Sequence, residues 1–351
     1  MLQLDMKMLF RLIRILFLLL IIFYGCQRPI QLTDADKLAN FFNKNAVNIL
    51  VTDSGLGGVS VAADVFERMN GSGVFEKVNV IFFNAQPHIK SGYNSMETTE
   101  QKMQIFENAL KAMNENFKPD IILIACNTLS VLYPLTTFSK ETEIPVIGIV
   151  ETGVDQIKKE LDNDHHAKVL IFATKTTVQQ NSHKKMLIEM GVDEKRIITQ
   201  ACPKLAGSIE RGTQSDETLG LVDQYVSEAL NKISEENSAI LVSFNCTHYG
   251  YISDVFEKKF IAFDRPLVKL IDPNPRMADF IFIDKYLNRY KKTEVSIKVV
   301  SQPELNEKRI ESIGSLIEKV SPQTAIAMRQ YQFTPDLFEW ESIANSDGNK
   351  N

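Results

Sequence analysis

The chain has 351 residues, of which 44% are hydrophobic and 24% are charged, and its formal net charge is -5. This composition is typical of a soluble globular protein with one large domain or two ordinary ones. The acidic balance, and the lack of a stretch that combines Lys and Arg with aromatic residues, argue against nucleic-acid binding.

The first 26 residues differ from the rest of the chain. Basic residues as far as Arg14 precede the apolar run ILFLLLIIFY, and Gly25 is followed by Cys26. This pattern predicts a secretory signal over residues 1–26 and a bacterial lipoprotein site, with lipidation of Cys26. We therefore expect a membrane-anchored lipoprotein or a periplasmic protein. The alternatives are an uncleaved N-terminal anchor, or a start assigned too far upstream, in which case the protein would be cytoplasmic.

Beyond a polar linker predicted over residues 27–47, short apolar runs alternate with amphipathic helical patterns. Such runs are typical of parallel strands that are covered on both faces. They form two rounds of four, at residues 48–55, 78–84, 120–128 and 144–150, and then at 168–174, 196–203, 239–247 and 267–273. We predict an α/β protein of two pseudo-symmetric, flavodoxin-like parallel-sheet halves, with the active site in the cleft between them.

The predicted domains are an N-terminal half over 48–150 and a C-terminal half over 151–290. The remaining segment, 291–351, contains the strand-like run VSIKVVS and the helix-like run NEKRIESIGSLIEKV, followed by a polar tail. We expect this segment to pack onto the sheets, and we assign no chemistry to it. A homodimer is compatible with the sequence, which does not specify an oligomeric state.

Chemically suggestive residues follow the ends of the predicted strands, where open α/β sheets bind their ligands. Asp53 precedes Cys126 by almost the same number of positions as Thr174 precedes Cys246, which supports a duplication. If the halves face each other, these two cysteines approach one cleft from opposite sides. With Cys202 they make three cysteines beyond the signal, so at least one thiol must be free.

Two opposed thiols suit proton exchange at a stereocentre. One thiolate removes a proton from one face of a carbon, and the opposite thiol returns a proton to the other face. Cysteine fits this task because its unperturbed pKa of about 8.5 lies near working pH. A single cysteine at a strand end is more often a small buried apolar residue, but the matched pair favours catalysis.

Two other interpretations of these segments are possible, a zinc site and a phosphate-binding loop. Cys126, Cys246 and His248 could be three zinc ligands with an open fourth position, although only Asp53 and Glu210 are evident as supporting carboxylates. The segment DSGLGG at 53–58 lacks the Lys-Ser/Thr pair of a P-loop, so we interpret its glycines as allowing a tight turn from strand to helix.

The segments VTDSGLGG, ACNTLS, ATKTTV, ACPKLAGSIERG, CTHY and KLIDPNP occur in this order between about residues 48 and 280. They resemble the cofactor-independent glutamate racemases of the aspartate/glutamate racemase superfamily. The resemblance implies that Cys126 and Cys246 are the acid/base pair, that Asp53 assists Cys126, and that His248 assists Cys246. Glu210 matches the acidic residue that follows the ACP segment in that family.

The resemblance also implies that a small acidic amino acid is the ligand and that neither a cofactor nor a metal is used. The residues that it assigns to substrate binding are Ser54, Gly92, Asn127, Thr128, Thr177 and Thr247.

The sequence departs from the family around the expected pocket. Gly92 is kept in IKSGYNS, but the family's tyrosine is displaced or lost, and Asn245 and Gly250 stand where the family usually has Gly and Pro. Racemisation of L- and D-glutamate is the first expectation, and in this family it supplies cell-wall peptidoglycan synthesis. Aspartate or another acidic amino acid is the next choice. A lipid-anchored amino-acid-binding protein without catalysis is the alternative from another class.

Overall fold

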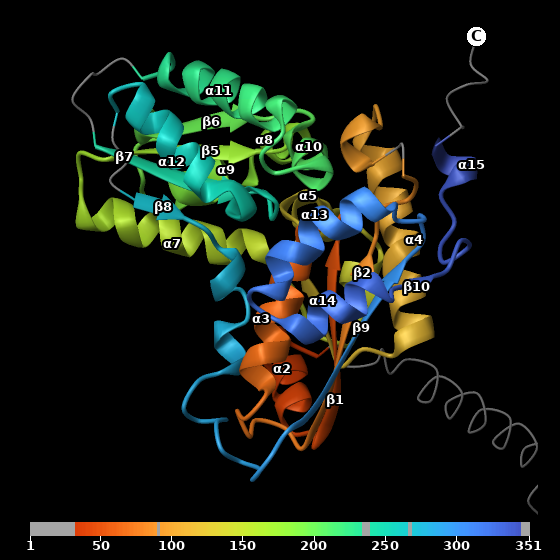
Figure 1. Ribbon diagram of the computed structural model, residues 1–351. Helices are drawn as coiled ribbons and strands as arrows, with labels where there is room; N and C mark the ends of the chain where they lie inside the picture. The colour runs from red at the N-terminus through yellow and green to blue at the C-terminus, as the bar shows by residue number, and fades with distance from the viewer. Residues whose placement is uncertain (1–31, 90–91, 234–238, 266–268, 345–351) are drawn as a thin grey trace, which may run out of the picture.

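The computed structural model describes residues 32–89, 92–233, 239–265 and 269–344, which form two α/β halves (Figure 1). The strands are β1 (Ala46–Asp53), β2 (Lys77–Asn84), β3 (Ile121–Ile124), β4 (Val146–Gly148), β5 (Lys168–Ala173), β6 (Ile197–Ala201), β7 (Ile240–Asn245), β8 (Lys269–Ile271), β9 (Glu294–Ser301) and β10 (Gln332–Phe333). One sheet has the order β10-β9-β2-β1-β3-β4, the other has the order β6-β5-β7-β8, and all pairs are parallel.

Helices connect the strands and cover both faces of the sheets. They are α2 (Asp34–Phe42), α3 (Val59–Met69), α4 (Thr99–Phe117), α5 (Asn127–Leu132), α6 (Phe138–Glu141), α7 (Ile149–Asn163), α8 (Lys175–Gln180), α9 (Ser182–Glu189), α10 (Leu205–Arg211), α11 (Asp216–Leu230), α12 (Ser253–Ala262), α13 (Glu307–Glu318), α14 (Pro322–Arg329) and α15 (Glu341–Ala344). Along β1, Ile49 and Val51 contribute to one hydrophobic core and Leu50 to a second. Both faces of this strand are therefore buried, which explains its unbroken apolar run.

The order β2-β1-β3-β4 in the first half repeats as β6-β5-β7-β8 in the second, which confirms the predicted pair of α/β halves. The register refines the predicted correspondence between them. Thr52 pairs with Ile124, and Ala173 pairs with Asn245. If this register is continued past the strand ends, Ser54 lies beside Cys126 and Thr174 lies beside Cys246. Ser54, and not Asp53, is therefore the equivalent of Thr174. The predicted match was therefore shifted by one residue.

Part of the stretch predicted as a linker, 27–47, is a helix. Thr33 caps α2 through a reciprocal capping box, and Phe41 packs edge-on against Phe75 with ring centroids 5.0 Å apart. The lipidation prediction for Cys26 concerns residues outside the described part of the chain. Within the part that the structure describes, no helix is long and apolar enough to cross a membrane.

The C-terminal segment completes the first half. Strand β9 pairs with β2 along its whole length, and α13 packs against α14 on this half and against α10 of the second half. Figure 1 shows α13, in blue, beside the green α10. The segment predicted only to pack onto the sheets therefore bridges the two halves next to the cleft.

Candidate active site

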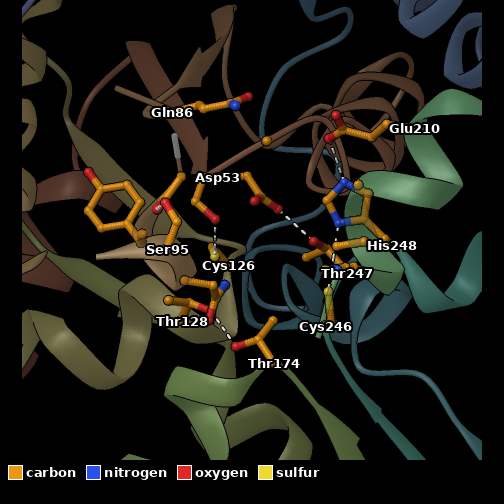
Figure 2. Close-up of a pocket in the computed structure, with 18 of the residues that line it drawn as sticks. Asp53, Gln86, Ser95, Cys126, Thr128, Thr174, Glu210, Cys246, Thr247 and His248 are labelled. Atoms are coloured by element: carbon orange, nitrogen blue, oxygen red, sulfur yellow. Dashed lines mark hydrogen bonds and ion pairs between the residues drawn. The ribbon is translucent and has the colours of Figure 1, made fainter. Parts of the chain in front are cut away.

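A cavity of about 700 Å³ opens between the halves at the carboxyl ends of their strands. Residues that follow the strands of each half line it, among them Asp53, Gly92 and Cys126 from the first half and Thr174, Cys202 and Cys246 from the second. Figure 2 shows Cys126 and Cys246 on opposite sides of this cavity. The volume lies in the range of sites that enclose small molecules.

Cys126 lies between the end of β3 and the first turn of α5, and it is buried. Its Sγ is 3.1 Å from Oγ of Ser54, the residue that occupies the neighbouring position beyond β1. Burial raises the pKa of the Cys126 thiol, and the charge of Asp53 raises it further, against the opposing hydrogen bond from Ser54. Cys126 is therefore a thiol at neutral pH and suits the role of proton donor.

Cys246 follows β7 and has a different neighbour. Its Sγ is 3.7 Å from Nδ1 of His248, and Nε2 of the same ring is 2.7 Å from Oε1 of Glu210. Burial alone would lower the pKa of His248, but its hydrogen bonds with Cys246 and Glu210 outweigh burial and raise that pKa well above its usual value. His248 therefore lies where it can exchange a proton with Cys246, which suits this cysteine to the role of base.

Glu210 lies on α10 and is buried. The backbone N–H of Leu56 donates to Oε1 at 2.8 Å, and Arg309 is paired with Oε2. Burial would raise the pKa of Glu210, but the hydrogen bond from His248 and the charge of Arg309 lower it to about 2. The carboxylate is therefore ionised and holds the imidazole in one orientation.

Two of the hydrogen bonds that join the halves occupy similar positions in the two halves. Thr247 donates to Oδ2 of Asp53 at 2.6 Å, and the hydroxyl oxygens of Thr128 and Thr174 are 2.8 Å apart. Burial raises the pKa of Asp53, although the charge of His248 and the bond from Thr247 act against it. Each bond links a residue that follows the cysteine of one half to the end of the first strand of the other half.

Five of the residues that we expected to bind substrate line the cavity: Ser54, Gly92, Asn127, Thr128 and Thr247. The sixth, Thr177, does not. Its hydroxyl lies behind the wall, 3.0 Å from Thr174 and 3.4 Å from Thr128, and supports both side chains. Thr174 occupies the wall position in its place.

Asn127 offers an unused donor to a ligand. Burial lowers the pKa of His183 to about 4, so this histidine is neutral, and its Nε2 is 3.0 Å from Oδ1 of Asn127. Among the described residues, Nδ2 of Asn127 is buried without a hydrogen-bond partner. Because such a group costs free energy unless something accepts its hydrogen bonds, Asn127 is suited to bind a carboxylate.

The glycines of DSGLGG lie in the predicted turn from β1 to α3, but close packing and not backbone conformation requires them. Gly57 and Gly58 are not among the glycines with positive φ. A Cβ on Gly55 would lie 2.7 Å from Oε1 of Glu210, and a Cβ on Gly57 would lie 2.2 Å from Oγ1 of Thr247. The loop is therefore glycine-rich because it lies directly against Glu210, Thr247 and His248 of the opposite half.

Sequence reasoning missed Arg309, Gln86 and Tyr93 in the cavity wall. Tyr93 is next to Gly92 and fully buried, so the tyrosine that is displaced in sequence still lines the cavity. Arg309 shares the buried stripe of α13 with residues four and eight positions further on, Ile313 and Ile317. A charged residue on the apolar stripe of an amphipathic helix was the available signal.

The zinc alternative receives no support from the arrangement of side chains. Across the described residues, no three His, Cys, Asp or Glu side chains are grouped so that they could hold a metal ion. Cys126 and Cys246 instead have separate partners, Ser54 and His248.

Gly250, which replaces a proline of the family, faces a buried carboxyl. A Cβ at this position would lie 2.3 Å from Oδ2 of Asp272. Burial raises the pKa of Asp272 from 3.8 to about 6, against the hydrogen bond from the backbone N–H of Asn274. Because the folded protein holds this proton more tightly than the unfolded chain, Asp272 lowers stability as the pH rises from about 4 to about 6, and the loss persists above that.

We therefore expect Asp272→Asn to change how stability depends on pH. The free energy of unfolding of the variant relative to the parent should increase by about 2 kcal/mol between pH 4.5 and pH 7.5. Urea unfolding of both proteins at the two pH values measures this difference. A difference that does not depend on pH would show that Asp272 titrates normally in the folded protein.

Residues 49–280 match the family described as Asp/Glu/Hydantoin racemase. The glutamate racemase of Lactobacillus acidophilus is 30% identical over 231 residues, which are 66% of this chain and 78% of that protein. The glutamate racemase of Aquifex pyrophilus is 29% identical over 213 residues, which are 60% of this chain and 75% of that protein.

A solved structure shares the fold. The glutamate racemase of Francisella tularensis, in complex with D-glutamate, superposes with a TM-score of 0.59 at 20% identity, over 82% of this chain and 95% of that one. The sequence match covers most of both halves of the cavity, including both cysteines. The chain therefore belongs to the Asp/Glu/Hydantoin racemase family.

Proposed function

We propose that the protein interconverts L- and D-glutamate by proton transfer at Cα, without a cofactor. One observation carries the proposal: Cys126 and Cys246 follow equivalent strands of the two halves and line one cavity from opposite sides. The relatives from Aquifex pyrophilus and Lactobacillus acidophilus are glutamate racemases, which supports glutamate as the substrate. Aspartate is the second choice within the same chemistry.

The proton transfer balances between the two thiols. The thiolate of Cys246 takes the proton from Cα, and the electron pair of that bond is delocalised into the α-carboxylate. The thiol of Cys126 then gives its proton to the opposite face. The enzyme is left with a thiol at Cys246 and a thiolate at Cys126, and turnover of the other enantiomer restores the first form.

The cavity wall supplies donors for the charge that develops on the carboxylate. Asn127 has its free Nδ2, and the hydroxyl of Ser54 lies 3.1 Å from Sγ of Cys126. Fixed donors of this kind stabilise a developing anion more than water does, because they need no reorganisation during the reaction.

Proton NMR in D₂O tests the proposal with the reduced protein lacking residues 1–26. We expect the Cα proton signal of L-glutamate, and separately that of D-glutamate, to disappear while the opposite enantiomer accumulates. Chiral chromatography measures that accumulation. Exchange without inversion would show that only one of the two thiols works.

Folded, reduced protein that leaves the Cα proton of both enantiomers intact would remove glutamate as the substrate. The same experiment with aspartate then follows. If calorimetry detects binding of either amino acid while NMR detects no exchange, the protein is a binding module and the proposal of catalysis fails.

We also propose that Cys26 is lipidated and anchors the enzyme to a membrane, with the catalytic domain outside the cytoplasm. The signal-like pattern of residues 1–26 supports this location. There the enzyme would act on glutamate or on peptidoglycan-derived amino acids. Mass spectrometry of the mature N-terminus tests the proposal, because a diacylated Cys26 is expected and an intact Met1 would contradict it.

A further inference from the structure

Arg309 is a buried cation at the edge of the cavity. Its side chain is 9% exposed, and Nη2 pairs with Oε2 of Glu210. The same nitrogen donates to Oε1 of Gln86 at 2.9 Å. Gln86 follows β2 of the first half and Glu210 lies on α10 of the second. A single guanidinium therefore contacts both halves at the cleft.

This arginine comes from outside the region that defines the family. The family match ends at residue 280, whereas Arg309 belongs to the first turn of α13. Ile313 and Ile317, on the same stripe of this helix, are buried in the core, which fixes the helix against the first half. The position of Arg309 is thus set by packing, and its charge is delivered to the catalytic side chains from a third segment of the chain.

We propose that Arg309 is a positioning residue: by keeping Glu210 ionised and in place, it holds the His248 ring ready to exchange a proton with the neighbouring thiol. This inference rests on the proposed two-thiol racemisation and deepens it. It assigns to the C-terminal segment a part in the chemistry of only one of the two thiols.

The argument depends on which nitrogen of His248 carries a fixed proton. An ionised Glu210 accepts a hydrogen bond from Nε2–H, so Nδ1 is left to take up or release the proton of Cys246. A protonated Glu210 would instead donate to Nε2. Nδ1 would then carry the proton permanently and could not accept another.

Arg309 and the hydrogen bond from His248 together favour the ionised state of Glu210. A buried carboxylate that loses its cationic partner tends to take up a proton. Besides Arg309 and Cys246, the ionisable groups around Glu210 and His248 are Asp53 across the cleft and Tyr251. Neither Asp53 nor Tyr251 is a cation, so among these groups Arg309 is the cation that adds to His248 in offsetting the charge of Glu210.

The test isolates each thiol with a serine variant. In a Cys126→Ser background the remaining exchange of the Cα proton into D₂O reports Cys246, and in a Cys246→Ser background it reports Cys126. Adding Arg309→Met should slow the exchange by Cys246 at least about tenfold and shift the acidic limb of its pH profile upward by about one unit. The exchange by Cys126 should change less than about threefold.

Three further variants make the result specific. Arg309→Lys retains the charge and should recover part of the lost rate. Combining Arg309→Met with Glu210→Gln should slow exchange no more than Glu210→Gln alone, because both changes act through the same carboxylate. Arg329→Met removes a surface arginine that pairs with Glu318 on the same segment and should leave racemisation unchanged.

Equal losses from both thiols would reduce Arg309 to a structural role and overturn the inference, as would no loss from either. A second measurement needs no substrate. The alkylation rate of Cys246 is followed against pH in leaderless protein carrying Cys126→Ser and Cys202→Ser. Arg309→Met should move its midpoint to higher pH. An unmoved midpoint contradicts the inference even if glutamate proves to be the wrong substrate, whereas a moved midpoint without glutamate exchange overturns only the choice of substrate.

Discussion

Replacing either Cys126 or Cys246 by serine should lower the racemisation of both enantiomers by about 1,000-fold. A serine hydroxyl ionises far less readily than a thiol, so it can neither form the base nor return the proton at a useful rate. The cavity should stay intact, because serine is nearly isosteric with cysteine. Polarimetry of D- and L-glutamate measures the loss, and circular dichroism checks the fold.

The two variants should also differ from each other in a defined way. Each retains one thiol, which still removes the Cα proton of the single enantiomer that presents it. Proton NMR in D₂O should therefore show slow exchange of one enantiomer in Cys126→Ser and of the other enantiomer in Cys246→Ser. Exchange of the same enantiomer by both variants would contradict the opposed arrangement.

Cys202→Ser provides the matched control. Cys202 also follows a strand and touches the cavity, and burial raises its pKa well above the usual value. It contacts the carbonyl of Gln200 and not a histidine or a serine hydroxyl. We expect its replacement to change the rate only a few-fold. A loss as large as that of the other two would mean that Cys202 is part of the chemistry.

Gly57→Ala should reduce activity by at least about 100-fold, although residue 57 has no chemistry of its own. The new methyl group would lie 2.2 Å from Oγ1 of Thr247 and 2.6 Å from Nδ1 of His248. Both side chains must move, and Nδ1 is the atom next to the Cys246 thiol. Overpacking of this kind should also cost about 1–3 kcal/mol of stability. Steady-state rates and urea unfolding measure the two effects.

Gly220→Ala is the same chemical change in a place where it should help. Gly220 is exposed within α11, and a Cβ there would meet no atom within 4 Å. Alanine favours the helix, so stability should rise by about 0.5–1 kcal/mol with no change in rate.

Full activity of Gly57→Ala would contradict the first of these two predictions. It would mean that the loop at 53–58 can withdraw from the opposite half.

The sequence predicted the fold well because each buried parallel strand leaves a local signal, an unbroken apolar run. Even the three-residue strand β4 was found from such a run. The duplication made Cys126 and Cys246 visible as a pair. The structure was needed to show that both cysteines line one cavity, because no local sequence pattern specifies how the two halves contact each other.

The features that sequence reasoning missed or placed differently have separate causes. Arg309 lies 99 positions from Glu210, so no spacing rule relates them. The glycines at 57 and 58 look like turn residues because local geometry and close packing both select glycine. The resemblance assigned Thr177 to substrate binding, but Thr174, at the start of α8, and not Thr177 lines the cavity.

The return of β9 to the first sheet has a topological consequence. Because β4 ends at Gly148 and β9 begins at Glu294, the whole second half is an insertion between two strands of the first. Two covalent crossings therefore connect the lobes, which restricts their relative motion to bending about the line through the crossings and opposes free swivelling. An excised insert over 149–293 would carry Cys246, His248 and Glu210, yet neither Cys126 nor Arg309.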